Sequence, residues 1–347
     1  MKKSLLLIFS AFVLSFSVQA AEILIAPTSP EAVNNLSVAL ASAADGDVIV
    51  LSEGTYVESN EIQFDAKSVT IKAAEGANVV LQLQAPITIS NGAKATLQGI
   101  KLDASQLGSH KHVIEATDAT DGKALVMDGC ELYGYSVVHA AIYVAEANTL
   151  KVCEVKNCYF HDNMNSCIFF EGALSNFLLI QSTFANIATS SSEYMSVVDV
   201  RNANYAIINH CTFYNCQAMN TDHAAIKLEC DGLIANSVIV APESHGAYRA
   251  IHVKDGWNVE AKNCLSFNYT KDSGGFRSAV KKVDCLMNTD PLFVDAVNGN
   301  FSFAVGSPAL ASGTNGTNMG DLRWNPSDID DGIAYDFPSE DIPVEDE

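Results

Sequence analysis

Short runs of alternating hydrophobic and polar residues recur along this chain at intervals of 25 to 30 residues. Within each run the apolar side chains fall on every second position, which is the period of a β-strand with one buried face. The aligned aliphatic positions of these strands are Ile114, Ile142, Ile168, Val198, Ile226 and Ile251. A unit this short cannot bury its apolar face alone, so the repeat predicts stacked copies that share one core.

A second strand repeats in the same phase, and one position in it is occupied by cysteine or serine. The residues at this position are Cys130, Cys158, Ser182, Cys211, Ser237 and Cys264. Small, weakly polar residues at one position of every copy indicate an internal ladder in which cysteine acts as a small hydrophobe. We therefore expect free, stacked thiols. Disulfides are the alternative, because neighbouring turns about 4.8 Å apart also permit a bridge.

The residue before this position is often asparagine, as in Asn157, Asn236 and Asn263. Asparagine tolerates the left-handed backbone conformation and bonds to nearby backbone groups, so we interpret these residues as structural corners of each turn. A ligand-binding role is the alternative.

Short strands separated by Gly, Asn, Asp and Ser turns predict an all-β fold, a right-handed parallel β-helix with about nine or ten turns. Alternation with a period of two in runs of three to five residues excludes a solenoid of helices, and the repeat is shorter than the roughly 40 residues of a propeller blade. A short helix that begins at Ser29-Pro30-Glu31 is expected to cover the first open strand edge.

Three segments with different compositions indicate the domain organisation. Residues 1–20 have a charged start, an apolar run and a small-residue cleavage site, which is typical of an export signal and too short for a membrane span. Residues 21–320 are predicted to form the β-helix domain, including its first cap and its closing segment. Residues 321–347 contain ten acidic residues and one basic residue, and we expect a solvated, flexible tail.

The formal net charge of −21 narrows the range of partners. Nucleic acids and anionic membranes require clustered cations, so neither is expected. A chain that is exported, does not span a membrane and carries this charge is predicted to be a monomer outside the cytoplasm: in the periplasm, at the outer surface or secreted.

Two segments resemble a known superfamily. The stretch from Ala39 to Tyr56 is similar to the first segment of pectate-lyase-like right-handed β-helix proteins, especially those related to chondroitinase B and alginate lyases. The stretches Asp290–Asp295 and Gly306–Leu310 resemble the closing segment of exported bacterial β-helix proteins. With the repeat, the resemblance covers roughly residues 23–320. It implies a polysaccharide partner and export by a Gram-negative-type bacterium.

The catalytic pattern of these lyases carries over only in part. It requires two acidic residues that hold calcium just before a catalytic lysine, and an arginine on the next turn. Lys227 and Arg249 match the lysine and the arginine, but Asn220 and Asp222 stand in place of the acidic pair with different spacing. Calcium is therefore a cofactor that the resemblance suggests and no motif here supports, and no metal ligand is assigned.

The middle residue of each Ile-x-Val strand should point away from the core. The resulting outer file is Glu115, Tyr143, Phe169, Asp199, Lys227 and His252. A second file, two residues further along, contains Glu171, Arg201, Glu229 and Lys254. Aromatic rings can stack on sugars, and charged groups can bind hydroxyls or carboxylates. The candidate substrate-binding residues are Tyr143, Phe169, Asp199, His223, Glu229, Tyr248 and Lys254.

If the protein is an enzyme, a polysaccharide lyase is the first hypothesis and a glycoside hydrolase the second. In a lyase, Lys227 or His252 would remove a proton next to a sugar carboxylate, and Arg201 or Arg249 would stabilise the enolate. A hydrolase would use Asp199 and Glu229 as paired carboxylates. The same charge alternation also stabilises stacked strands, so a non-catalytic scaffold or adhesive protein is the alternative function.

Overall fold

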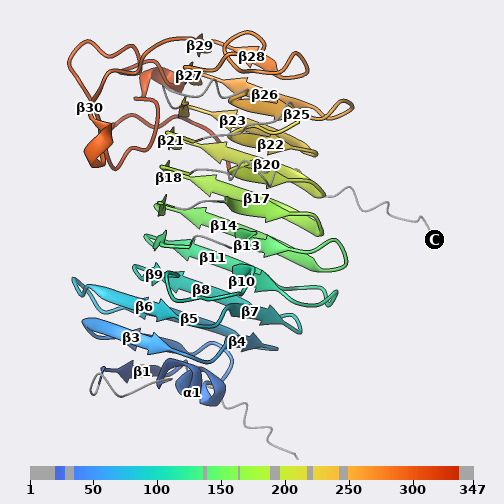
Figure 1. Cartoon of the computed structure of the whole chain (residues 1–347), viewed down its shortest axis with the longest axis vertical. Coiled ribbons are helices and arrows are strands. Elements are labelled where there is room, and N and C mark those ends of the chain that lie inside the picture. Colours follow the sequence, from blue (N-terminus) through green and yellow to red (C-terminus); the bar gives the residue numbers. More distant parts are fainter. Residues whose placement is uncertain are drawn as a thin grey trace, which may run out of the picture.

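The computed structural model describes residues 20–27, 35–135, 139–162, 165–187, 196–216, 222–241 and 249–335. These residues form a rod in which the chain coils through successive, nearly flat turns (Figure 1). Eight successive turns each add one strand to each of three sheets, here called A, B and C, and the pairings within these sheets are parallel. The predicted parallel β-helix is therefore confirmed.

Sheet A has eleven strands, sheet B ten and sheet C eight. Sheet A consists of β1 (Glu22–Ile25), β2 (Val48–Leu51), β5 (Ser68–Ala73), β8 (Lys94–Gln98), β11 (Ala124–Asp128), β14 (Thr149–Lys156), β17 (Ala173–Ile180), β20 (Ala203–Asn209), β23 (Asp231–Ala235), β26 (Val259–Lys262) and β28 (Lys281–Val283). Sheet B consists of β3 (Gly54–Glu58), β6 (Val79–Leu83), β9 (Lys101–Asp103), β12 (Glu131–Tyr133), β15 (Tyr159–His161), β18 (Thr183–Ala185), β21 (Thr212–Tyr214), β24 (Val238–Val240), β27 (Leu265–Phe267) and β29 (Leu286–Met287).

Sheet C consists of β4 (Ile62–Asp65), β7 (Ile87–Ser90), β10 (His112–Ala116), β13 (Ala140–Val144), β16 (Ser166–Phe170), β19 (Val198–Val200), β22 (Ile226–Leu228) and β25 (Ile251–Val253). The predicted nine or ten turns thus correspond to ten strands in sheet B and only eight in sheet C. Sheet C ends earlier because the last two turns continue in sheets A and B alone.

The repeated aliphatic residues fill the interior, as the alternation predicts. Ile142, Ile168, Val198 and Ile226 are at most 1% exposed and belong to one continuous core. Within sheet B the rings of Phe160, Phe184 and Phe213 form a parallel stack with centroid separations of 4.9 and 4.7 Å. Equivalent positions on successive turns therefore lie directly above one another, and every feature of one turn is repeated as a file along the rod.

The cysteine and asparagine positions form the corner between sheets A and B. All nine cysteines, each within the described part of the chain, are free thiols, and eight are buried. Where serine replaces cysteine it bonds to the neighbouring turn: the Ser182 and Ser237 hydroxyls accept hydrogen bonds from the backbone N–H groups of Cys158 and Cys211, both at 3.1 Å. Asn157, Asn236 and Asn263 have positive φ angles of 54°, 49° and 50°, which confirms the predicted left-handed corner.

The helix α1 (Asn35–Ser42) lies at the first end of the rod (Figure 1) and buries Leu36 and Leu40 against the core. The predicted start of this helix, Ser29–Glu31, lies outside the described residues. Its N-terminal end is bound by the carboxylate of Glu58, which accepts hydrogen bonds from the backbone N–H groups of Leu36 at 2.9 Å and Ser37 at 3.4 Å. A carboxylate at this position satisfies unpaired N–H groups and complements the helix dipole.

We expect Glu58→Ala to lower the free energy of unfolding by about 1–3 kcal/mol, because it leaves buried helix N–H groups without acceptors. Glu58 is 1% exposed, so water cannot readily replace the lost carboxylate. Urea unfolding followed by circular dichroism measures the change. The Glu53→Ala variant, whose side chain makes no such contact with the helix among the described residues, serves as a control and should unfold like the parent. If the Glu58→Ala variant had the same free energy of unfolding as the parent, the capping role would be contradicted.

The C-terminal segment does not stop at the end of the rod. It first forms an antiparallel pair, β30 (Phe293–Asp295) and β31 (Asn300–Phe303), joined by the short 3₁₀ helix η1 (Ala296–Asn298). It then folds back along the corner of sheets A and B, and this part includes a second 3₁₀ helix, η2 (Thr314–Gly316). Its backbone bonds to earlier turns, for example from Gly320 N–H to the Asn236 carbonyl at 2.7 Å. We call residues 304–335 the return segment.

The beginning of the predicted flexible tail belongs to this return segment, and that expectation needs correction. Asp321 is fully buried and accepts a hydrogen bond from the Thr183 hydroxyl at 2.7 Å. Asp331 is 9% exposed and contacts His210 Nε2 at 3.1 Å. Packing thus continues to Tyr335, whose hydroxyl accepts a bond from Asn209 at 2.8 Å. An acidic composition therefore predicts a solvated segment only where the fold offers no buried hydrogen-bond donors to the carboxylates.

No helix in the described ranges is both long and apolar enough to cross a membrane. The predicted export signal, residues 1–20, lies outside the description except for its last residue, and so stays a prediction.

Candidate functional site

The outer residues of sheet C form the continuous file that the repeat predicts. The strand registers pair Glu115 with Tyr143, Tyr143 with Phe169, Phe169 with Asp199, Asp199 with Lys227, and Lys227 with His252. These residues come from β10, β13, β16, β19, β22 and β25, the stacked strands on one side of the rod (Figure 1). We call these six residues the sheet C file.

The sheet C file is much less exposed than an open sugar track would be. Phe169, Asp199, Lys227 and His252 are 2%, 0%, 7% and 5% exposed, and only Glu115 and Tyr143 are partly exposed. The four buried side chains do not point into the core, because their strand neighbours, such as Val198 and Val200, fill it. They are covered from outside, in part by the long polar side chains of the second file.

Arg201 is the centre of this covering layer. Its guanidinium donates two hydrogen bonds to the Asp199 carboxylate, both at 3.1 Å, and one to Glu171 at 3.2 Å. Its central carbon lies 4.5 Å from the ring centre of Phe169, within the range of a cation–π interaction. These contacts fix Arg201 over the junction between the aromatic and charged parts of the file and raise its pKa, through Asp199 first, against the opposing effect of burial.

Lys227 is held between two carboxylates. Its Nζ atom lies 2.9 Å from Glu229 and 3.7 Å from Asp199, and Glu229 in turn contacts Lys254 Nζ at 2.7 Å. The two lysines lower the pKa of Glu229, although burial opposes the change. The predicted role of Lys227 as a proton acceptor would require its amine to leave these two carboxylate partners. Only Lys254, whose side chain is 62% exposed, points its charge to solvent.

His252 is a neutral imidazole at neutral pH. Burial, with the positive charges of Arg277, Arg249 and Lys227, lowers its pKa to about 4. Its Nε2 atom lies 2.7 Å from the Arg277 guanidinium, which can only donate, so Nε2 accepts and Nδ1 carries the proton. Nδ1 is buried and has no hydrogen-bond partner in the described part of the chain.

The remaining predicted residues lie around this charged end. Arg249, one turn from Lys227, forms an ion pair with Asp272 at 2.5 Å. His223 Nδ1 lies 3.4 Å from the Ser196 hydroxyl, and burial lowers its pKa, with Lys227 contributing in the same direction. Tyr248 lies outside the described residues. The roles proposed for these residues in proton transfer or sugar binding stay predictions.

The aromatic end of the file also includes two histidines, His112 and His139, that are not among the candidate substrate-binding residues predicted from the sequence. The His112 ring stacks on Tyr143 with centroids 3.9 Å apart, and His139 meets Phe169 edge-on at 5.2 Å. Burial and the neighbouring His139 lower the pKa of His112 to about 4, so its ring is uncharged at neutral pH. The Tyr143 hydroxyl donates to Glu171 at 2.9 Å, which orients its ring.

Beyond the aromatic cluster lies a cavity of about 350 Å³. Its walls are formed by Pro86, Ser109, His110, Lys111, His112 and Glu115. Burial raises the pKa of Glu115, and the nearby carboxylate of Glu61 adds to the effect. The cavity brings a cation, a carboxyl group and an imidazole to the end of the sheet C file.

A calcium ion does not fit the charged end of the file. Asp199 and Glu229, the carboxylates at this end, are each already paired with Arg201 or with lysines. In the part of the chain that the structure describes, no group of three or more His, Cys, Asp or Glu side chains is arranged to bind a metal. We therefore derive no step through a metal ion.

The site residues that sequence reasoning missed have two causes. Arg277 comes after the last sheet C strand, where the repeat has ended, so no periodic position predicts its contact with His252. His112 and His139 lie at the start of strands or just before them, and their pairing with Tyr143 depends on side-chain direction.

The strand topology defines the class of this protein: a parallel β-helix with three sheets. A family model described as a domain of unknown function, DUF4957, matches residues 54–187, less than half of the chain. A search of curated protein sequences finds no match.

Among solved structures the chain is similar to the PL6 family alginate lyase AlyGC, with 16% identity and a TM-score of 0.44 over 76% of this chain and 38% of that one. A mutant of the same enzyme gives 16% identity and a TM-score of 0.49 over 79% and 39% of the two chains. Pectate lyase Pel9A gives 12% identity and a TM-score of 0.41 over 88% and 97%. The chain thus spans about two fifths of the length of the alginate lyase it resembles. The fold assignment rests on the strand register itself.

Proposed function

We propose that the outer face of sheet C binds a polysaccharide that contains uronic acids, with the sugar chain lying along the sheet C file. The observation that carries this proposal is the unbroken register of the file through six consecutive turns. Successive turns are about 4.8 Å apart, a spacing comparable with the length of one sugar unit. With each unit a linear polymer can therefore meet one further turn of this face, through Glu115 and Tyr143 where the file is exposed and through Arg201 and Lys254 of the second file where it is covered.

The chemistry along the file suits an acidic sugar chain. Tyr143, with His112 stacked beneath it, offers a partly exposed ring that is held in place by Glu171. Arg201 and Lys254 remain partly or largely exposed and offer N–H donors to carboxylates. Lys111 lines the terminal cavity. Because the protein as a whole is strongly acidic, such local cations are what a polyanion would need.

Cleavage of the bound chain is the second candidate, and His252 is the observation that favours it. A neutral imidazole beside Arg249, Arg277 and Lys227 is in the protonation state of a general base, surrounded by cations that would stabilise an enolate. Its Nε2 lone pair is directed at Arg277, so proton abstraction would require that contact to open. Binding needs no such rearrangement, which is why we place it first.

Tyr143→Ala is expected to weaken binding of an alginate or polygalacturonate oligosaccharide about fivefold, as loss of an aromatic contact costs on the order of 1 kcal/mol. Isothermal titration calorimetry on the mature protein measures the affinity. Tyr205→Ala is the matched control, because Tyr205 is a partly exposed tyrosine on β20 of sheet A, away from the file. Neutral oligosaccharides of the same length test the need for carboxylates. Equal affinities for both variants would disprove the proposed location.

The same preparations decide whether the chain is cut. A lyase creates an unsaturated product that absorbs ultraviolet light, and His252→Gln should abolish its formation while leaving binding intact. Shorter products without this absorbance would indicate hydrolysis. Binding without any product would indicate a recognition protein. The absence of both binding and product would favour the scaffold or adhesive function.

A further inference from the structure

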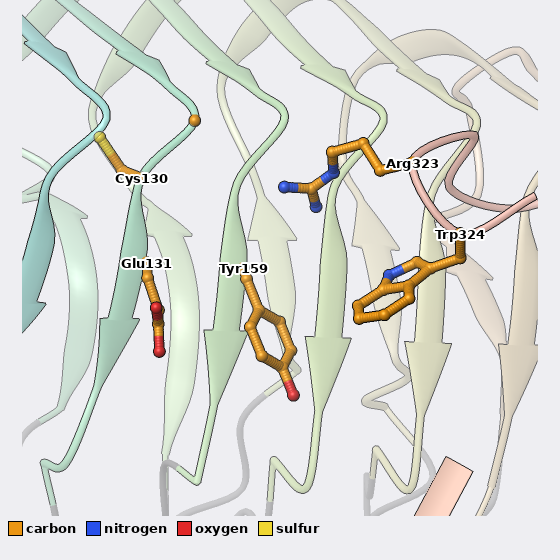
Figure 2. A pocket seen from close by; sticks show the side chains of 6 residues that line it. Cys130, Glu131, Tyr159, Arg323 and Trp324 are labelled. Atoms are coloured by element: carbon orange, nitrogen blue, oxygen red, sulfur yellow. The ribbon is translucent and has the colours of Figure 1, made fainter. Parts of the chain in front are cut away.

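A separate cavity of about 280 Å³ lies on sheet B, where the side chains of Arg323 and Trp324 from the return segment reach toward β12 and β15. It is lined by Gly129, Cys130, Glu131, Tyr159, Arg323 and Trp324 (Figure 2). Its volume is just below the range of about 300–1,000 Å³ that is usual for small-molecule sites. The cavity lies on a different sheet from the sheet C file and shares no residue with it.

Two aromatic side chains from distant parts of the sequence form the walls. Tyr159 comes from β15, and Trp324 reaches in from the return segment (Figure 2). Phe301, which is 1% exposed, supports both: its ring is 6.3 Å from Tyr159 and 5.3 Å from Trp324, edge-on in each case. Rings backed by a buried phenylalanine cannot collapse into the core, so the space between them is built into the fold.

At this point the return segment is held by hydrogen bonds from the side chains of Arg323 and Trp324. The indole N–H of Trp324 donates to the Thr183 hydroxyl at 3.0 Å. Arg323 donates to Asp321 and to the backbone carbonyls of Asn157 and Cys158, the latter at 2.8 Å. Both side chains are therefore held before any ligand arrives, which lowers the entropy cost of binding.

The charges that border the cavity are already neutralised. Glu131 contacts Lys101 Nζ at 3.1 Å and His161 Nε2 at 3.0 Å, and Arg323 is paired with Asp321. Burial raises the pKa of Tyr159 to about 12, with Asp162 and Glu131 adding to the effect, so its phenol keeps its proton. A ligand that carried a net charge would have to compete with these pairs, whereas hydroxyl groups can share them.

We propose that this cavity binds one ring of a neutral saccharide, with its C–H face against Tyr159 or Trp324 and its hydroxyls on Glu131 and the Tyr159 phenol. Aromatic rings with an apolar face and a polar edge suit a sugar, which has an apolar ring face and a polar rim. Neutral charge distinguishes this ligand from the acidic polymer proposed for sheet C. The site requires the return segment in place, so it exists only in the complete fold.

The chain contains only two tryptophans, which makes the test direct. Trp257 is 42% exposed in a turn before β26, so Trp257→Phe should leave the fold intact and Trp324 as the sole indole. In this protein we expect cellohexaose, xylohexaose or mannohexaose to shift or quench the fluorescence in a saturable way, and trigalacturonate to have no such effect.

Substitutions in the same background locate the binding. Tyr159→Ala should raise the dissociation constant about tenfold, and Glu131→Gln, which keeps the size of the side chain, should weaken binding to a lesser degree. Tyr133→Ala is the matched control, because Tyr133 lies on the neighbouring β12 and does not line the cavity. Far-ultraviolet circular dichroism confirms that each variant is folded.

Three results would overturn the proposal. The first is no response to any of the neutral oligosaccharides at millimolar concentration, and the second is a response to trigalacturonate alone. The third is that the Glu131→Gln variant, the Tyr159→Ala variant and the parent all bind the neutral oligosaccharide with the same affinity. None of these results bears on Tyr143 and the sheet C file, so the two proposals can fail separately.

Discussion

Replacing Phe184 by alanine is expected to lower the free energy of unfolding by about 3–5 kcal/mol, because it opens a cavity in the interior. Phe184 is fully buried and is the middle ring of the sheet B stack. It lies between Phe160, at 4.9 Å and an interplanar angle of 6°, and Phe213, at 4.7 Å and 4°. Its loss therefore removes two stacking contacts as well as buried area.

Urea unfolding followed by circular dichroism measures this loss. Phe184→Leu is the conservative variant and should cost less, since leucine fills most of the volume and leaves only the stacking unmade. Because each turn contacts only its neighbours, we expect the alanine variant to unfold over a broader range of urea concentration rather than with a uniform shift. A loss no larger for alanine than for leucine would contradict the packed stack.

Replacing Asp199 by alanine is expected to cost about 3 kcal/mol, because it leaves two cations without their buried partner. The carboxylate is fully buried and accepts two hydrogen bonds from Arg201 at 3.1 Å, and Lys227 lies 3.7 Å away. We choose the lower part of the usual range because the Arg201 side chain is 30% exposed and can regain some hydration. The Asp199→Asn variant should fall between the parent and the alanine variant.

A double variant distinguishes this ion-pair effect from simple loss of packing. Asp199→Ala combined with Arg201→Met removes both charges and should be less destabilised than the sum of the single variants. Denaturant unfolding of the four proteins gives the coupling energy. If Asp199→Ala lowered the free energy of unfolding by less than about 1 kcal/mol, the pair would contribute no more than an ordinary surface ion pair. The buried, desolvated network inferred for this face would then be wrong.

These predictions also show where sequence reasoning succeeds. The positions of Asp199 and Lys227 on adjacent turns follow from the 28-residue step between Val198 and Ile226, because a repeat with one strand per turn must place equivalent residues side by side. The same logic identified the outer file and the corner positions near Asn236. It did not reveal that Asp199 is fully buried, since burial of an outer residue depends on what lies over it.

The sheet B cavity could not have been predicted at all from the repeat. Tyr159 and Trp324 are separated by most of the second half of the chain and meet only because the return segment folds back. Acidic composition argued for a solvated tail from Asp321 onward. In the structure Asp321 and Asp331 instead satisfy buried donors from Thr183, Asn209 and His210.

By itself, the sequence determined the fold class and the stacking of equivalent side chains into files, because a periodic pattern with one strand per turn leaves only one way to bury its apolar face. At the cysteine corner it left free thiols and disulfides as alternatives, and the structure has free thiols there. Only the tertiary structure decided which outer residues are accessible, which charges neutralise one another, and where the non-periodic segments lie. Arg277 and Trp324 illustrate the physical reason: their contacts join segments that share no period, so their positions depend on the path of the whole chain rather than on any local pattern.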